Sequence, residues 1–257
     1  MTQSISVEIY DQLKTAFDFF NAELFGGSLP ECILTVQREK QTMGYFSPFR
    51  WSNTNGKIAH ELALNPAYFA GHPLLEVFQT LVHEQCHLWQ QEFGKPSRTC
   101  YHNREWAAKM VSIGLIPTDT GLPGGKQIGQ KISDYADPGG VFETACIKLV
   151  QQGFFISWID RRVAETPSTQ ASCSPSVDVV IQNLHNGEAS SSLEPQAIME
   201  ILNTKVSSTI KGFETVQANF SPTRMKYSCE NCLINVWGKP NLKLICADCN
   251  KLLQACG

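Results

Sequence analysis

The sequence predicts an α+β domain that is followed by a small second module near the C-terminus. Over residues 7 to 113 the hydrophobic pattern changes from helical spacing to three short β-rich segments and back to helical spacing. Residues 164 to 222 are rich in Ser and Pro and poor in aromatic residues. Two Cys-x2-Cys pairs then follow. We therefore expect a first domain over 1–163, a largely disordered linker over 164–222 and a cysteine-rich module over 223–257. Within the linker, "QAIMEILNTKVSSTIKGF" (196–213) could form a short helix.

Length and composition place the chain among ordinary globular proteins. Its 257 residues can build one good-sized core and something smaller, and 42% of them are hydrophobic and 18% charged. There is no run of about 18 apolar residues, and the start "MTQSISVEIYDQ" lacks the features of a signal peptide. We expect a cytoplasmic protein without a membrane partner. Because the net charge is −3, any contact with DNA would need a local basic patch.

The first four predicted elements are a helix and three strands. Residues 7–25 place apolar side chains at helical spacing, and "FGGSLP" ends that helix. Three short segments then alternate with turn residues and are rich in β-forming residues. The predicted strands are "CILTVQRE" (32–39), "GYFSPFRW" (44–51) and "KIAHELALN" (57–65).

Two further helices and a closing segment complete the predicted domain. A long helix follows Pro73 and runs to about Phe93, and "HNREWAAKMVSIG" (102–114) predicts another. The Gly-rich residues 119–142 are interpreted as a loop. Residues 141–163 are apolar enough to pack back onto the core and close the domain.

The long helix carries "LVHEQCHLWQQ" (81–91), in which two histidines lie four residues apart around a glutamate. At 100° per residue, apolar side chains cover more than half of this helix. The remaining strip holds His83, Glu84 and His87 among neutral polar residues and Glu76, without any Lys or Arg. A solvent-facing strip usually carries Lys, Arg and Glu, so this composition favours the wall of a cleft.

Histidines at i and i+4 point to the same side of a helix, as shared zinc coordination requires. Glu84 projects about 100° around from His83, close to the metal without binding it. It is a candidate general base that takes a proton from water activated by zinc. Cys86 projects toward the apolar arc, which favours a buried thiol over a fourth ligand or a redox switch.

A catalytic zinc needs a third protein ligand and an open position. His102 is the best candidate, because it opens the next predicted helix on the stripe that Trp106 extends into the core. His60 lies on a strand face, His72 precedes a proline in a turn, and His185 falls in the linker. The alternative interpretation is that His102 caps a helix, or that His83 and His87 are buried histidines with ordinary hydrogen bonds.

Taken together, residues 7 to 160 resemble the SprT-like family of zinc metalloproteases, both bacterial and Spartan-type. The resemblance rests on "FNAELFGGSLP", "GYF", "IAHELALNP", "LVHEQCHLWQ" and "HNREW". In the last motif the family's histidine is the third zinc ligand, and Asn103 stands where Gly is commoner. The resemblance implies a zincin-like fold and metal-assisted hydrolysis of peptide bonds, in some members on proteins bound or crosslinked to DNA.

Two features of such a site stay open at this level. In zincins the strand before the active-site helix commonly lies along the substrate backbone. "KIAHELALN" could do so here, and an ordinary internal strand is equally compatible with the sequence. Tyr101, Arg104 and Tyr135 are the candidates for stabilising the oxyanion besides the zinc.

Cys229, Cys232, Cys246 and Cys249 have the spacing of a structural zinc site with four cysteine ligands. Such a site closes the coordination shell, so this second zinc would hold the fold together and perform no chemistry. A hairpin, "LINVWGKPNLKLI" with its turn at "GKPN", is expected between the two pairs. Redox disulfides or coincidence are the alternatives. The other six cysteines are scattered and are expected to be mostly reduced thiols.

The module also carries a modest basic surface with aromatic residues between the cations. Tyr227 lies among these residues, and the candidate DNA contacts are Arg224, Lys226, Trp237, Lys239 and Lys243. Such a surface could hold single-stranded or distorted DNA through phosphate contacts and stacking. The alternatives are a solvated face or a ribbon that binds protein. The resemblance to the SprT-like family favours DNA.

Three functional hypotheses follow. The leading one is a zinc endopeptidase that cleaves proteins on DNA, which would place it at the nucleoid. The second is a general cytoplasmic zinc peptidase without DNA dependence. The third is a non-catalytic zinc-containing DNA-binding or regulatory protein, against which Glu84 argues because a scaffold needs no general base.

Overall fold

A computed structural model shows a mixed α/β protein and describes residues 4–39, 42–162, 193–209, 213–214 and 224–256. The chain divides into two compact units, Met1–Val216 and Gln217–Gly257. Within the described ranges no helix is long and apolar enough to cross a membrane.

The first unit opens with helix α1 (Ile5–Phe25) and three strands, close to the ranges that the sequence predicts. These strands are β1 (Ile33–Val36), β2 (Gly44–Ser52) and β3 (Ile58–Leu64). They form one sheet in the order β1-β3-β2, with β3 parallel to β1 and antiparallel to β2. The suggestion that "KIAHELALN" lies along a substrate is therefore wrong, because β3 is central and both of its edges are paired. The free edge beside the long helix belongs to β2.

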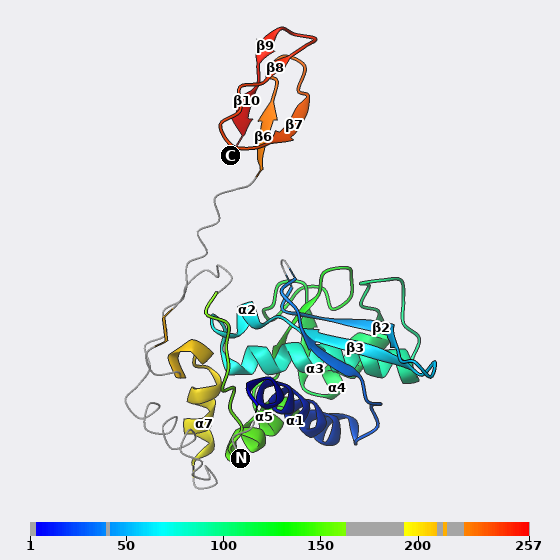
Figure 1. Cartoon of the computed structure of the whole chain (residues 1–257). Helices are drawn as coiled ribbons and strands as arrows, with labels where there is room; N and C mark the ends of the chain where they lie inside the picture. Colours follow the sequence, from blue (N-terminus) through cyan, green and yellow to red (C-terminus); the bar gives the residue numbers. More distant parts are fainter. Residues whose placement is uncertain (1–3, 40–41, 163–192, 210–212, 215–223, 257) are drawn as a thin grey trace. The chain divides into compact units, whose positions relative to one another are not determined.

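The helices pack around one core below this sheet (Figure 1). Helix α2 (Pro66–Phe69) leads into α3 (Leu74–Phe93), which contacts β2 and β3 on one side and α1 on another. Helix α4 (Arg104–Ser112) packs against α3, and α5 (Val141–Gln151) packs against α1. The side-chain amide of Gln85 is fully buried and donates to the Phe17 carbonyl at 2.8 Å, which ties α3 to α1.

Gly44 lets β2 approach α3 closely. A Cβ atom at this position would lie 2.8 Å from the Thr80 Cγ2 atom and 2.9 Å from the Ala63 carbonyl oxygen. These distances are too short for any side chain, so glycine is required where the start of the edge strand passes α3. "GYF" thus marks the point at which β2 meets α3.

The expectation of a loop over residues 119–142 is wrong at one place. Strand β5 (Ser133–Ala136) pairs antiparallel with β4 (Leu115–Thr118), which directly follows α4. Glycines dominate the first part of this stretch, whereas "SDYA" is extended because β4 supplies its partner. The pairing brings Asp134 against the middle of α3, at Gln79 and His83, and Gly129 pairs with His102 just before α4.

The expected linker also contains part of the first unit. Helix α7 (Pro195–Leu202) buries Ile198 and Leu202 completely and packs against α5 and α3. The following 3-10 turn η2 (Val206–Thr209) is held by backbone bonds to His72 and Ala70. The short helix predicted at 196–213 is found as α7, whereas a disordered linker over all of 164–222 is corrected for residues 195–209. Most of the other positions of that predicted segment, with Cys173 and His185, lie outside the described residues.

The second unit consists of short strands around the four cysteines. Strands β6 (Met225–Ser228), β7 (Asn235–Gly238) and β10 (Gln254–Cys256) form a sheet in the order β10-β6-β7. Strands β8 (Ile245–Cys246) and β9 (Lys251–Leu252) pair with each other. The predicted hairpin between the two cysteine pairs is wrong, because β7 turns back onto β6 across the first pair and β8 joins β9 across the second.

Candidate metal centres and the groove beside the three histidines

Helices α3 and α4 bring three imidazoles together. The ligand nitrogens of His83, His87 and His102 all lie within 4.8 Å of one another. The Nε2 atom of His102 lies 3.1 Å from Nε2 of His87 and 3.3 Å from Nε2 of His83. A tetrahedral zinc with Zn–N bonds of about 2.05 Å requires nitrogens about 3.3 Å apart, so this spacing fits one shared ion.

The outer nitrogens of two rings determine which nitrogens carry protons. The Nδ1 atom of His83 lies 2.9 Å from Oδ2 of Asp134, and Nδ1 of His102 lies 3.2 Å from the Gly129 carbonyl oxygen. A carbonyl or a carboxylate only accepts, so each Nδ1 carries the hydrogen and each Nε2 presents a lone pair. Converging Nε2 lone pairs are the arrangement in which imidazoles bind one metal cation.

The protein environment keeps two of these rings neutral. Burial, together with the charge of His83, lowers the pKa of His102 to about 4 and that of His87 well below its ordinary value. At His83 burial opposes protonation, but the hydrogen bond that the ring donates to Asp134 and the charges of Glu84 and Asp134 raise the pKa. Neutral imidazoles are the metal-binding form, so His87 and His102 are ready to bind at neutral pH.

Trp106 forms the floor of the cluster. Its ring centroid lies 4.8 Å from that of His83, 5.1 Å from that of His87 and 4.4 Å from that of His102. The side chain is fully buried. Trp106 in "HNREW" therefore packs against all three imidazoles.

Asn103 explains how a residue other than glycine fits before α4. It is the N-cap of that helix, and its side-chain oxygen accepts from the Trp106 backbone N–H at 3.0 Å. The same oxygen accepts from the Gln90 amide at 2.7 Å, and the Asn103 amide donates to the Lys95 carbonyl at 3.0 Å. His102 thus precedes the helix instead of opening it, and Asn103 links its position to α3 and to the 94–101 loop.

Glu84 lies beside the imidazoles at the bottom of a groove. Burial raises the pKa of its carboxyl to about 7, with His83 opposing the rise, and the Phe46 backbone N–H on β2 also hydrogen bonds to it. Two adjoining hollows of about 600 and 620 Å³ meet here and share Thr42, Gly44, His83, Glu84 and Ile132. The groove runs between the first residues of β2 and the segment that contains Ile132.

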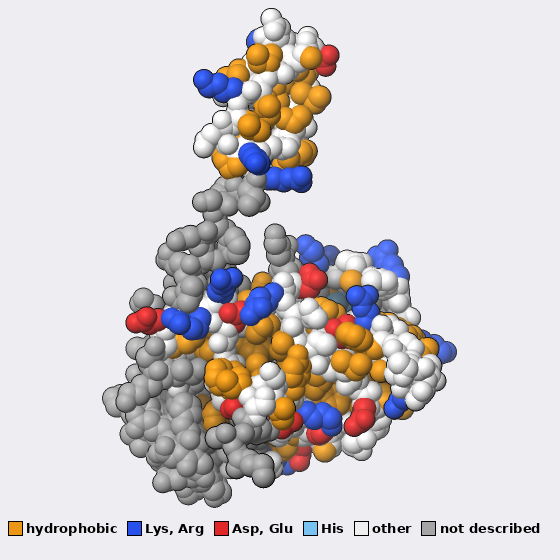
Figure 2. All heavy atoms as spheres, in the orientation of Figure 1, with side chains coloured by type: hydrophobic (Ala, Val, Ile, Leu, Met, Phe, Trp, Pro, Cys, Tyr) orange, Lys and Arg blue, Asp and Glu red, His pale blue; other side chains and the backbone are white. Residues whose placement is uncertain are grey.

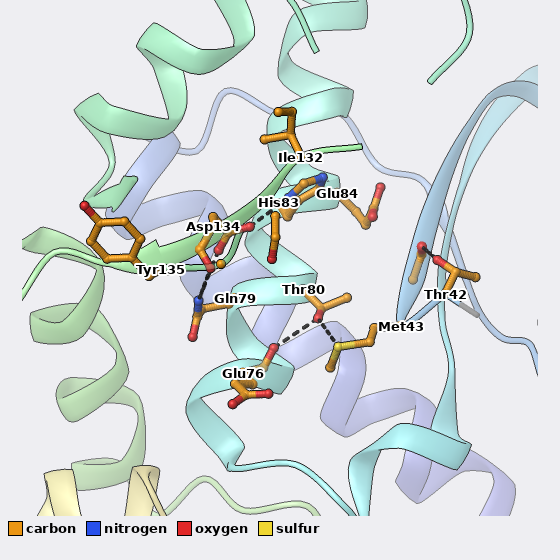
Figure 3. Close-up of a pocket in the computed structure, with 13 residues that line it drawn as sticks. Thr42, Met43, Glu76, Gln79, Thr80, His83, Glu84, Ile132, Asp134 and Tyr135 are labelled. Atoms are coloured by element: carbon orange, nitrogen blue, oxygen red, sulfur yellow. Dashed lines mark hydrogen bonds and ion pairs between the residues drawn. The ribbon is translucent and has the colours of Figure 1, made fainter. Parts of the chain in front are cut away.

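Asp134 is a site residue that the sequence analysis missed. Figure 3 shows it between His83 and Gln79, and its Oδ1 atom accepts from the Gln79 amide at 3.1 Å. The sequence does contain a pattern that could have indicated it. In "ISDYA" (132–136) polar and apolar residues alternate as in a short strand, and Asp134 is the charged residue of that strand.

Of the three residues considered for stabilising the oxyanion, two line the groove and one does not. Tyr101 lines one hollow and Tyr135 the other. Arg104 is exposed on α4 and lines a different cavity of about 630 Å³, with Gly125 and Ile128, so it does not reach the groove.

His60, His72 and Cys86 lie apart from the cluster. The His60 ring is buried, accepts from the Phe49 N–H at 3.1 Å and contacts Glu92 at 2.9 Å. His72 contacts Glu76. Cys86 is a fully buried thiol, as expected, and burial raises its pKa well above the ordinary range.

The second cluster joins the four cysteines of the C-terminal unit. The sulfurs of Cys229, Cys232, Cys246 and Cys249 lie within 4.8 Å of one another. The Cys232 and Cys246 sulfurs are 3.5 Å apart, near the roughly 3.8 Å edge of a tetrahedron with Zn–S bonds of about 2.3 Å. Backbone N–H groups of Cys232 and Asn231 lower the pKa of the Cys229 thiol to about 7. This donor set is compatible with zinc.

The five candidate DNA contacts lie on the same unit. Lys226 on β6 is paired directly with Trp237 on β7, and Trp237 is 62% exposed. Arg224, Lys239 and Lys243 are also exposed. Tyr227 is only 2% exposed, and its hydroxyl donates to the Lys239 carbonyl at 2.7 Å, so it cannot stack on a base. In the view of Figure 2, hydrophobic side chains cover much of the visible face of this unit, and Lys and Arg side chains lie around them.

These features define a protein with a candidate three-histidine metal centre on a His-Glu-x-x-His helix. Residues 13–123 match the model of the SprT-like family. The matched range contains α3, α4 and all three histidines.

One curated relative comes from Salmonella typhimurium and is described as an uncharacterized protein in the mucB 3' region. It is 58% identical over 40 residues, which are 16% of this chain. The match spans 54% of the relative, about half of its length. No solved structure matches the chain.

Proposed function

We propose that this chain is a zinc metallopeptidase with a zincin-like catalytic domain and a zinc ribbon. In this proposal His83, His87 and His102 hold a catalytic zinc, and Glu84 is the general base. The four cysteines hold a structural zinc. The observation that carries the proposal is the convergence of three Nε2 atoms beside a buried carboxyl in an open groove.

The residues of the chain supply proton transfer and orientation. Zinc, when bound, would polarise the peptide carbonyl and acidify water, as it does in other hydrolases. Glu84 is placed to accept the proton of the attacking water and to return it to the leaving amine. The Phe46 N–H and the packing of α3 against β2 hold the Glu84 carboxylate at the groove.

The groove favours an internal peptide bond over a chain end. Its two hollows extend to both sides of His83 and Glu84. Gly44, Tyr45 and Phe46 on the free edge of β2 line one wall. An extended peptide could pair with this edge and pass across Glu84, which is the usual way in which a sheet edge binds a peptide.

We further propose that the ribbon directs the peptidase to DNA. The support is the exposed Lys226–Trp237 pair and the surrounding Arg224, Lys239 and Lys243, which suit phosphate contact and base stacking. The resemblance to proteases that act on DNA-bound proteins points the same way.

A proteolysis assay on a DNA-binding protein tests both proposals. Purified zinc-loaded chain is compared with Glu84→Gln, with and without single-stranded DNA. We expect cleavage that the substitution reduces by at least about 100-fold while zinc content stays unchanged. Glu31→Gln, on an 85% exposed side chain, is the matched control and should cleave normally.

The outcomes separate the hypotheses. DNA-stimulated cleavage that Trp237→Ala weakens supports both proposals. A cleavage rate that changes neither with DNA nor with Trp237→Ala supports a general peptidase and rejects the proposal that the ribbon directs the enzyme to DNA. DNA binding by a zinc-loaded chain that never cleaves rejects the peptidase.

A further inference from the structure

Residues 129–134 form a short segment that contacts two of the three histidines from outside the helices that carry them. His102 exchanges two backbone hydrogen bonds with Gly129, at 2.8 and 3.0 Å. The Gly129 carbonyl also accepts from Nδ1 of His102, and Asp134 accepts from Nδ1 of His83. We call residues 129–134 the histidine strap.

The strap is itself fixed at both ends. Asp134 pairs with Pro117 and Ser133 with Thr118 in the two-stranded sheet that follows α4. The Asp134 carboxyl is only 8% exposed, and Gln79, one turn before His83 on α3, donates to its second oxygen. Both acceptors are therefore held in place before any metal arrives, and neither belongs to the ligand set.

We propose that the histidine strap is the positioning element of the three-histidine centre, with Asp134 and the Gly129 carbonyl selecting the Nδ1–H tautomer of His83 and His102. This inference rests on the proposed metal centre. A ring that donates through Nδ1 must present the lone pair of Nε2, and the hydrogen bond also fixes the rotation of the ring. His87 has no such acceptor in the strap and is oriented by stacking on Trp106, with 21° between the ring planes.

The strap also forms one wall of the groove. Gln130, Lys131 and Ile132 line one hollow, and Ile132 to Tyr135 line the other. A peptide in the groove would contact the same segment that orients the histidines. The strap is thus a positioning element at which substrate contacts and metal ligands meet.

The first test measures metal affinity in the full chain. Asp134→Ala removes the acceptor, whereas Asp134→Asn keeps an oxygen and loses the charge. We expect Asp134→Ala to weaken zinc binding at the histidine centre by about 10- to 100-fold in competition with a chelator, and Asp134→Asn to weaken it less. Asp137→Ala removes an exposed carboxylate three residues later and is the matched control with unchanged affinity.

The cysteine centre must be counted separately in this titration. Cobalt bound by thiolates gives charge-transfer absorption that cobalt bound by imidazoles lacks, so the two centres can be followed in one sample. His87→Ala defines the signal of the histidine centre. Only that signal should weaken in the Asp134 variants, and an equal loss at both centres would indicate misfolding and count against the proposal.

The second test reads the tautomers directly. In metal-free protein at alkaline pH, where both rings are neutral, NMR of the imidazole nitrogens should show Nδ1–H and an unprotonated Nε2 at His83 and His102 in the wild type. Asp134→Ala should release His83 alone. Gly129→Ala should disturb His102 alone, because Gly129 has a φ of +153° that other residues rarely adopt.

Unchanged tautomers together with zinc affinity within about two-fold of the wild type would overturn the proposal. That result leaves the peptidase intact, because cleavage by the wild type is measured independently. Conversely, a wild type that binds zinc and shows these tautomers but does not cleave would support the role of the strap and reject the proposed peptidase activity.

Discussion

At the scale of single residues, the Glu84 carboxyl links the chemistry of the groove to the stability of the metal-free protein. Burial raises its pKa to about 7 from an ordinary 4.5. Below pH 4.5 the carboxyl is protonated in both the folded and the unfolded chain. Between these two values only the unfolded chain ionises, so the free energy of unfolding falls as the pH rises. Above pH 7 the loss is complete, at about 3 kcal/mol.

Glu84→Gln should therefore stabilise the chelator-treated protein, and more so at high pH. We expect the difference in unfolding free energy between variant and wild type to be about 2 kcal/mol larger at pH 8 than at pH 5. Urea unfolding at the two pH values measures it. A difference that stays constant with pH would contradict the burial of an ionisable carboxyl here. Zinc should remove the effect, because a nearby cation stabilises the carboxylate.

The residues that could be predicted from the sequence are those with a local signature. His83, Glu84 and His87 share one helix, and the i, i+4 spacing alone places both imidazoles on one face. Asp134 lies 51 positions from its partner His83, and its short strand exists only because β4 pairs with it. The Gly129 carbonyl is a backbone group and has no signature in side-chain chemistry.

At the scale of elements, α7 shows that a packed helix can form within a segment whose overall composition is that of a linker. The Ser- and Pro-rich surroundings predict a linker, and only "AIMEIL" carries an apolar face. Its stability comes from packing against α5 and α3, which is a tertiary contact that local composition does not contain.

Ile198→Ala tests whether α7 belongs to the first unit. Ile198 is fully buried, so we expect a loss of about 2–4 kcal/mol in the unfolding free energy of that unit. Gln196→Ala, on an exposed position of the same helix, should change it by less than about 0.5 kcal/mol. Equal, small effects of both substitutions would mean that α7 does not pack as described. Urea unfolding of the full chain supplies the measurement.

The ribbon strands show a different limit. A turn such as "GKPN" predicts that the strands on either side pair with each other. Here the tight turns that pair strands are the two cysteine pairs themselves. Leu233 N–H donates to the Cys229 carbonyl and Asn250 N–H to the Cys246 carbonyl, so each pair closes its own hairpin. The backbone bonds within the two cysteine pairs therefore outweigh the turn propensity of "GKPN" in a segment this short.

At the scale of the whole molecule, the two compact units have different sources of stability. The first buries a large apolar core, whereas the core of the second is Tyr227, Leu253 and the cysteines. Such a small core cannot offset the loss of chain entropy without a metal. The two units should therefore lose their structure independently.

Cys232→Ser should unfold the second unit and leave the first folded. We expect the amide resonances of residues 224–256 to collapse to the random-coil range in NMR spectra, while those of α1, α3 and α5 keep their positions. Ser207→Ala, a substitution of similar size in the first unit, is the control and should leave the ribbon resonances unchanged. Persistent ribbon resonances in Cys232→Ser would show that this unit folds without a complete ligand set.

The indole beneath the three imidazoles has a practical consequence. Indole emission responds to charge and to heavy atoms beside the ring, and Trp106 is the fully buried tryptophan among those described. Binding of a metal at the histidine centre should therefore change the intrinsic fluorescence of the chain. Titrating the apoprotein with metal, and subtracting the same titration of Trp106→Phe, isolates an optical reporter that needs neither label nor substrate.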